Sequence, residues 1–321
     1  MPLKTFLFAD KKKKEKTMPG INDVSIDEIM TNLKVYSGVY EQEMVDAAIE
    51  RRDEIIPRLI EVLEGVQADP ETYLEDEDLF GHIYAVMLLG HLKATEAHRT
   101  IVDLFSMPGD IPDDLFGDIT TSDLPMILLR TCGGSLNLIR AMALNRDASD
   151  YCRNSALQAM AYAVVEGIAD RKEILDFFGT LFTGEETDPD SDFWGGLACN
   201  ILELYPEESM DVIKKGYEND LIAPGMVAYE DFEIALEQGK EKTLSRLKAN
   251  YDRDALDDIH ASMGWWACFQ PDEKPVHDPE LTAPFFDMPD RISTKAPKKK
   301  NAKKKKKKRK QAKASKRKNR R

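Results

Sequence analysis

The chain has 321 residues, with 45 Lys or Arg against 58 Asp or Glu and a formal net charge of −13 at pH 7. Its hydrophobic content of 42% is enough to build a sizeable core. No apolar run reaches the roughly 18 residues that a membrane-spanning helix needs, and Thr5 to Ala9 is too short for the apolar region of a signal peptide. We therefore expect a cytoplasmic protein without a membrane span.

The charge is divided between two parts of the chain. Residues 291–321 contain 19 Lys or Arg and no acidic residue. The first 290 residues contain the other 26 basic residues and all 58 acidic ones, which gives them a formal charge of −32. The two parts are therefore predicted to bind partners of opposite charge.

The first 20 residues are predicted to form a disordered leader. They contain four consecutive lysines, Lys11 to Lys14, and end in a Pro-Gly turn. Met18, immediately before that turn, is an alternative natural start. Ser25 with Glu28 three residues later predicts the capped start of a first helix, and the apolar pattern from Met44 to Leu63 predicts a helix pair around Pro57.

A repeated motif follows. Asp-Leu-Phe-Gly occurs at Asp78 to Gly81 and again, 36 residues later, at Asp114 to Gly117. An Asp followed by an aromatic residue recurs at Asp150, Asp192 and Asp231, after further intervals of 36, 42 and 39 residues. Because Asp is a favourable N-cap, we interpret these positions as successive helix starts. At the second copy Pro125 favours a later start, near Ser122 or Asp123.

Apolar residues recur at helical spacing after these starts, and a second helix is predicted after each short polar break. The first helices contain Ala85 to Leu92, Ala156 to Val164 and Leu197 to Leu204, and the second ones centre on Leu104, Phe178, Ile213 and Leu247. β-Branched alternation never persists for five residues. The sequence predicts an all-α fold, an α-solenoid of five to six HEAT-like hairpins over residues 21–270.

The closing stretch Asp257 to His260 and Met263 to Phe269 resembles an uncharacterised bacterial family called domain of unknown function eleven-eighty-six. The resemblance covers about residues 18–270 and implies a HEAT-type helical array, with no known activity or catalytic residue. Members often end in a cysteine-rich zinc knuckle, the SEC-C motif, associated with translation. This chain has no cysteine after Cys268, so the resemblance implies no zinc ligand here.

Residues 271–290 are predicted to be an extended, proline-rich linker, and residues 291–321 a disordered polybasic tail. Such a tail binds polyanions by counterion release, and without aromatic residues it has no sequence preference. RNA, including ribosomal RNA, is the expected ligand. The alternatives are a role in solubility, binding of anionic lipid, a nuclear address in a eukaryotic host, and docking on the acidic body near Asp188 to Asp192 and Glu230-Asp231. The predicted nucleic-acid-binding residues are Lys298, Lys299, Lys300, Lys303, Lys304, Lys305, Lys306, Lys307, Lys308, Arg309, Lys310, Lys316, Arg317, Lys318, Arg320 and Arg321.

Residues that could carry chemistry lack partners at diagnostic spacing. Asp188, Asp190 and Asp192 resemble the start of a calcium loop, but Phe193 replaces its glycine and Cys199 its last glutamate. The histidines and cysteines are interpreted as packing or surface residues, and the cysteines as reduced core residues. We therefore expect no catalytic residue, no metal and no cofactor.

Trp265, Trp266 and Phe269 form an aromatic group at the end of the predicted array. They are predicted either to cap the last repeat or to bind a protein partner. The sequence as a whole favours a non-catalytic scaffold whose acidic body binds protein segments and whose tail binds RNA. The alternative is an enzyme with a carboxylate-lined groove between repeats.

Overall fold

The computed structural model describes residues 24–188 and 191–270. Every regular element within these two ranges is helical, and their β contacts are isolated bridges such as Val35 with Leu79. The predicted all-α class is therefore confirmed. The predictions for the leader at 1–20, the linker at 271–290 and the tail at 291–321 lie outside the described residues.

The N-terminal part of the fold begins as predicted, with the Ser25 hydroxyl accepting a hydrogen bond from the Glu28 amide at 3.2 Å. The break around Pro57 was placed wrongly, because Pro57 lies inside a helix and the chain turns at Arg51 instead. The helices up to residue 131 are α1 (Ile26–Lys34), α2 (Gln42–Glu50), α3 (Arg52–Ala68), α4 (Pro70–Glu75), α5 (Gly81–His91), α6 (His98–Phe105), α7 (Ile111–Phe116), α8 (Ile119–Ser122) and α9 (Leu124–Thr131).

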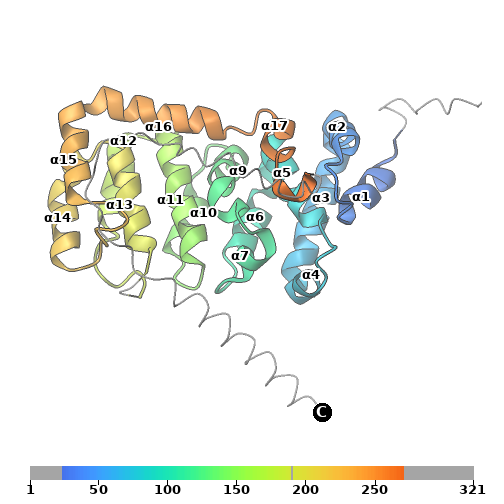
Figure 1. The fold of residues 1–321 in the computed structure, drawn as a ribbon, viewed down its shortest axis with the longest axis horizontal. Helices are drawn as coiled ribbons and strands as arrows, with labels where there is room; N and C mark the ends of the chain where they lie inside the picture. The colour runs from blue at the N-terminus through green and yellow to red at the C-terminus, as the bar shows by residue number, and fades with distance from the viewer. Residues whose placement is uncertain (1–23, 189–190, 271–321) are drawn as a thin grey trace, which may run out of the picture. The chain divides into compact units, whose positions relative to one another are not determined.

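The remaining helices run from residue 137 to the end of the described chain (Figure 1). The described ranges also contain three short 3₁₀ helices, η2 (Thr95–Ala97), η3 (Glu207–Ser209) and η4 (Ala267–Phe269). The α-helices of this part are α10 (Asn137–Leu144), α11 (Asp150–Val165), α12 (Arg171–Gly179), α13 (Phe193–Glu203), α14 (Met210–Glu218), α15 (Tyr229–Gln238), α16 (Lys240–Asp254) and α17 (Ile259–Met263).

The aspartates of the repeated motif do not play one common role. Asp78 lies before α5, whose N-cap is Phe80, and Asp114 lies inside α7, whose C-cap is Gly117. Asp150 is the first residue of α11 and follows its N-cap Ser149. Asp192 is the N-cap of α13 but makes no capping bond there. Asp231 lies in the first turn of α15, where its carboxylate accepts from the Ala228 amide.

The aspartate motif does not locate the helix caps. Asp is favourable anywhere in the first turn of a helix and also in turns, so its recurrence does not identify an N-cap. The capping side chains that the structure does show include Asp69 for α4, Asp170 for α12 and Asp258 for α17. The later start at Pro125 is confirmed, since α9 begins at Leu124 with Asp123 as its N-cap.

The core follows a row of helices in chain order. Helices α3, α5, α9, α11 and α13 each pack against the next one in the row, and the other helices flank them (Figure 1). The central helices α5 and α11 are buried around most of their circumference, including Tyr84, Met87 and Tyr162. A helix that is apolar all round must lie between neighbours on several sides, which explains their central place.

The C-terminal part of the described chain turns back along this row. Helix α16 crosses α13 and α11, and α17 then packs against α5 (Figure 1). The Tyr36 hydroxyl donates a hydrogen bond to the Cys268 carbonyl, and His91 Nδ1 lies 2.8 Å from the Leu256 carbonyl oxygen. In a simple stack each repeat touches only its neighbours, so this return contact is an addition to the predicted arrangement. Across the described ranges, no helix combines the length and apolarity needed to cross a bilayer.

Candidate functional site: an acid-lined groove beside the returning C-terminal segment

Phe269, in η4, is held in a cluster of aromatic rings from the N-terminal helices. Its ring centroid lies 5.5 Å from that of Tyr40 and 5.7 Å from that of Phe80, and Tyr36 and Tyr84 complete the cluster. Aromatic pairs in tilted and edge-to-face arrangements contribute about 0.5 to 1.5 kcal/mol beyond area burial. The cluster therefore fixes the end of the described chain against the loop before α2 and the start of α5.

A polar contact fixes α17 at the same place. His260 Nε2 lies 2.9 Å from Asp46 Oδ1 on α2, and His260 Nδ1 lies 2.9 Å from the Tyr40 hydroxyl. Burial raises the pKa of the Tyr40 hydroxyl well above its usual value, so Tyr40 stays protonated. The segment from Asp254 to Gln270 is thus joined to the N-terminal helices by both apolar and polar contacts.

This return leaves a hollow between the C-terminal segment and the helices beneath it, with a volume of about 1030 Å³. We call it the acid-lined groove. Its apolar side chains come from three separate parts of the chain: Phe80, Ile83, Phe116, Ile119, Ala255, Ala261, Trp265, Trp266 and Ala267. Its charged side chains are six aspartates and one arginine: Asp118, Asp123, Asp252, Asp254, Asp257, Asp258 and Arg253.

Most of these carboxylates have individual partners. Asp257 forms an ion pair with Arg130 at 2.7 Å, which lowers the pKa of that carboxyl. Asp254 accepts from the Tyr162 hydroxyl at 2.6 Å and pairs with Arg253 at 2.9 Å. Burial raises the pKa of Asp123, and the charge of Asp254 adds to this effect. Asp252 also pairs with Lys248. The groove keeps a net negative charge, because its six aspartates are matched by three cations, Arg130, Arg253 and Lys248.

The structure brings together part of the predicted aromatic group. Trp265 lies at the groove with 70% of its surface exposed, and Trp266 lines the groove while stacking on Phe269 at 6.0 Å. Phe269 is buried, but against the N-terminal helices and not over the last helices of the row. The expected cap over the last repeat is corrected accordingly, because the chain returns to α5 before it reaches these residues.

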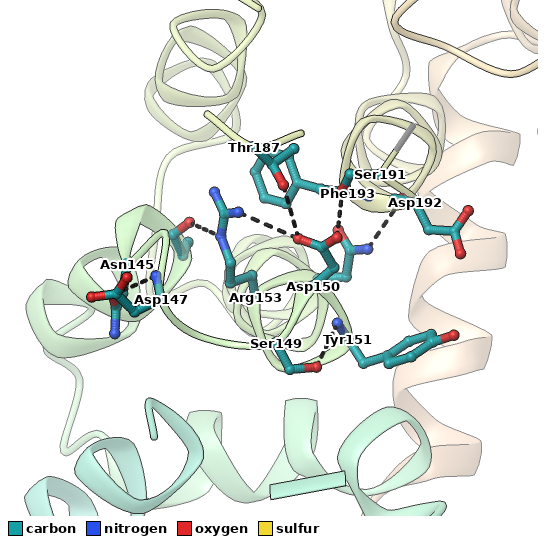
Figure 2. A network of polar contacts seen from close by, with 12 residues as sticks. Asn145, Asp147, Ser149, Asp150, Tyr151, Arg153, Thr187, Ser191, Asp192 and Phe193 are labelled. Carbon is teal, nitrogen blue, oxygen red and sulfur yellow. Dashed lines mark hydrogen bonds and ion pairs between the residues drawn. The ribbon is translucent and has the colours of Figure 1, made fainter. Parts of the chain in front are cut away.

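The neighbours of the proposed calcium-loop residues, Thr187 and Ser191, contact Asp150 at the start of α11 (Figure 2). The Asp150 carboxylate accepts from Ser191 Oγ at 2.5 Å and Thr187 Oγ1 at 3.3 Å, and it pairs with Arg153 at 3.4 Å. This network ties the loop before α13 to the start of α11. Asp192 points away from Asp150 (Figure 2). Asp190 lies outside the described residues.

The remaining chemistry-bearing residues are dispersed. His82 and His98 are buried, and burial lowers the pKa of both, whereas His91 contacts the Leu256 carbonyl. Cys132 and Cys152 are buried free thiols as expected, but Cys268 is exposed. In the part of the chain that the structure describes, no three His, Cys, Asp or Glu side chains come together as a set that could hold a metal ion.

Sequence reasoning found the aromatic side of the groove and missed its acidic side. Asp118 and Asp123 are separated from Asp252 to Asp258 by about 130 residues of sequence, so no spacing rule joins them. The only local signal was the density of aspartates between Asp252 and Asp258 beside two tryptophans. The nucleic-acid-binding residues predicted from Lys298 to Arg321 lie outside the described residues.

The similarity to known proteins extends over about the same part of the chain that the structure describes. The chain is 28% identical over 244 residues to an "Uncharacterized protein" of Chlamydia muridarum, covering 76% of this chain and 97% of that protein. It is also 28% identical over 239 residues to an "Uncharacterized protein" of Chlamydia trachomatis, covering 74% and 95%. No solved structure matches the chain significantly. The family described as "Protein of unknown function (DUF1186)" matches residues 24–270, and the chain belongs to this family.

Proposed function

We propose that this protein is a non-catalytic scaffold of the bacterial cytoplasm that joins a protein partner to RNA. The acid-lined groove binds a basic segment of the partner, and the Lys/Arg tail binds RNA or another polyanion without sequence preference. The observation that carries this proposal is the composition of the groove, where six aspartates and a single arginine lie beside an apolar wall that includes two tryptophans.

Charge complementarity supports a basic occupant. A groove with an excess of aspartates attracts Lys and Arg side chains and repels acidic segments, which favours both fast association and selectivity. Burial raises the pKa of Asp123 and the charge of Asp254 adds to this effect, so the two carboxylates of this pair repel each other when both are ionised. A cationic ligand would relieve that repulsion.

Trp265 supports a peptide ligand with an apolar side chain. Trp265 adjoins the apolar wall of the groove, and tryptophan is among the residues that contribute most to binding energy in interfaces. Trp265 is 70% exposed although its neighbour Phe269 is buried. We propose that the partner covers Trp265 while its basic residues contact Asp118 and Asp123.

We further propose that the row of helices from α3 to α13 is a HEAT-like solenoid in which α16 and α17 form a closing strap. Helices α3, α5, α9, α11 and α13 pack against one another in chain order, and the other helices flank this row. Both features support this interpretation. The strap gives the solenoid a second wall, and the groove lies between that wall and the row.

The groove is tested with a labelled peptide that alternates Lys or Arg with Leu and is titrated in a fluorescence polarisation assay. We expect binding that weakens about tenfold in Trp265→Ala and in Asp118→Asn/Asp123→Asn. The matched control Asp211→Asn, on α14 and outside the groove, keeps the affinity of the parent protein. Equal affinity in all four proteins would disprove the groove as the binding site.

The tail is tested by comparing the full chain with residues 1–290 for retention of structured and unstructured RNA. Because counterion release dominates such binding, log affinity should fall steeply with log salt for the full chain and be lost on truncation. The same pair of proteins is used in the peptide assay. If the tail competes for the groove, truncation will strengthen peptide binding; unchanged RNA retention by residues 1–290 would contradict the assignment of RNA to the tail.

A further inference from the structure

A second, smaller hollow lies between α11 and α13, with a volume of about 210 Å³. It is separate from the acid-lined groove, although the two share the α8 region: Thr121 lines this pocket, and Ser122 lines the groove. We call it the α11/α13 pocket. Its lining residues are Thr121, Tyr151, Asn154, Ser155, Gln158, Gly196, Cys199, Asn200 and Glu203.

Two hydroxyls of the pocket, those of Ser155 and Thr121, already donate to the protein. The Ser155 hydroxyl donates to the Thr120 carbonyl at 2.5 Å, and the Thr121 hydroxyl donates to the Asp118 carbonyl at 3.1 Å. A hydroxyl whose single hydrogen is used in this way can only accept from a ligand.

The side-chain amides of the pocket are also oriented by hydrogen bonds that they donate to the protein. Asn200 Nδ2 donates to the Gly196 carbonyl at 2.9 Å, Asn154 Nδ2 donates to the Asp192 carbonyl at 3.4 Å, and Gln158 Nε2 donates to the Tyr162 hydroxyl at 3.0 Å. Because a backbone carbonyl only accepts, the two asparagine nitrogens are placed unambiguously. The amide oxygens of Asn154 and Asn200 have no hydrogen-bond partner among the described residues, but they are enclosed by the protein and closed to a ligand. Gln158 is the remaining amide of the pocket lining that can offer its oxygen.

Glu203 supplies the charge of the pocket. Its carboxylate makes no hydrogen bond and no ion pair within 4.0 Å to any residue in the two described ranges. Burial raises its pKa, and the charge of Asp254 acts in the same direction. Arg246 and Arg253 on α16 act in the opposite direction, but neither lines the pocket, and Arg253 is paired with Asp254.

The pocket therefore combines one unpaired carboxylate with neutral acceptors and has no Lys or Arg in its lining. Such a set repels anions, and an apolar ligand would leave the Glu203 carboxylate without a partner. Tyr151 lines the pocket with 51% of its surface exposed, which provides an aromatic face for a planar cation.

We propose that the α11/α13 pocket binds the guanidinium group of an arginine side chain, with Glu203 as its counter-ion and Gln158 Oε1 as a second acceptor. A guanidinium carries five N–H donors in a fixed plane, so it matches several acceptors at once and stacks on an aromatic ring. An ammonium group would satisfy the charge but fewer of the acceptors. This site is independent of the acid-lined groove and of the proposed scaffold function.

The ligand test uses N-acetyl-arginine methylamide, with the citrulline analogue as a neutral isostere and the lysine analogue as a second cation. Chemical-shift perturbation of the full chain measures each affinity. We expect the arginine compound to bind, the lysine compound to bind several-fold more weakly and the citrulline compound to bind at least tenfold more weakly. An arginyl tripeptide and free arginine, tested alongside, distinguish a peptide from a small-molecule source of the guanidinium.

The residue test uses Glu203→Gln, which removes the charge and keeps the shape. Because burial already disfavours the charged form of Glu203, this variant is expected to fold as stably as the parent protein. Glu207→Gln, four residues later and exposed in η3, is the matched control. Loss of arginine binding in the first variant alone supports the proposal; undetectable binding by the parent protein, equal binding of citrulline, or unchanged binding by Glu203→Gln would overturn it.

Discussion

His260 on α17 and Asp46 on α2 are 214 residues apart in the sequence, yet their side chains meet at 2.9 Å. Tyr40 contacts the other ring nitrogen of His260 at 2.9 Å. This contact, together with the aromatic cluster around Phe269, fixes α17 against the N-terminal helices and so helps to form the acid-lined groove.

The first prediction concerns this contact. His260→Ala removes both hydrogen bonds and is expected to cost about 1 kcal/mol, because the partners are partly exposed and regain water. The loss should be local: amide hydrogen exchange in residues 255–270 will speed up more than exchange in α11. Glu50→Gln, on the same helix as Asp46 and in no ion pair with another described residue, is the control. Equal acceleration of hydrogen exchange in all helices would contradict a contact that stabilises only residues 255–270.

The second prediction contrasts Phe269, which is buried, with Trp265, which is exposed. Phe269→Ala is expected to lower the free energy of unfolding by about 3 to 5 kcal/mol, since it leaves a cavity in the cluster of Tyr36, Tyr40 and Phe80. Trp265→Ala should change it by no more than about 0.5 kcal/mol, because Trp265 is 70% exposed. Urea unfolding measures both, and similar losses would show that Trp265 is structural.

The third prediction concerns two helical glycines. A Cβ at Gly90 would lie 2.8 Å from Ile127 Cγ1 and 3.1 Å from Leu256 Cδ1, whereas a Cβ at Gly65 would meet Tyr73 Oη at an ordinary 3.5 Å. Gly90→Ala should therefore destabilise by about 1 to 2 kcal/mol, the overpacking cost exceeding the gain in helix propensity. Gly65→Ala should stabilise by about 0.5 to 1 kcal/mol. Thermal unfolding checks the opposite signs.

The fourth prediction is a pH dependence. Glu208 forms a two-pronged contact with the buried Arg171 at 2.7 and 2.6 Å, which lowers the pKa of Glu208 from 4.5 to about 2. Because the folded-state pKa is depressed, this stabilisation is complete above pH 4.5 and disappears as the pH falls towards 2. Since Glu208 is 40% exposed, the effect is reduced by solvent.

Glu208→Gln should accordingly lower stability at pH 7 and flatten the acid limb of a stability profile recorded between pH 5 and pH 2. Glu207→Gln, at the exposed neighbouring position, should leave the acid limb unchanged. A variant profile parallel to that of the parent protein would show that the Arg171 contact does not depend on the charge of Glu208.

Helices with a clear apolar period could be predicted from the sequence. The regions of α5, α6, α11, α12, α13 and α16 were recognised because their burial follows local spacing. Short helices such as α4 and α10 were missed, since six or eight residues carry too little periodicity. The aspartate motif was over-interpreted because one residue type suits an N-cap, a first turn and a loop equally well.

The sequence by itself determined the all-helical class, the helix start at Ser25, the later start at Pro125 and the separation of charge between the body and the tail. These depend on propensities and spacings within a few turns of helix. Tertiary structure alone decided that α16 and α17 return to α5, that Asp123 approaches Asp254, and that Glu203 faces a pocket without a partner. The physical reason is that side chains far apart in sequence meet only through packing, and a carboxylate acquires its environment from residues that no local pattern identifies.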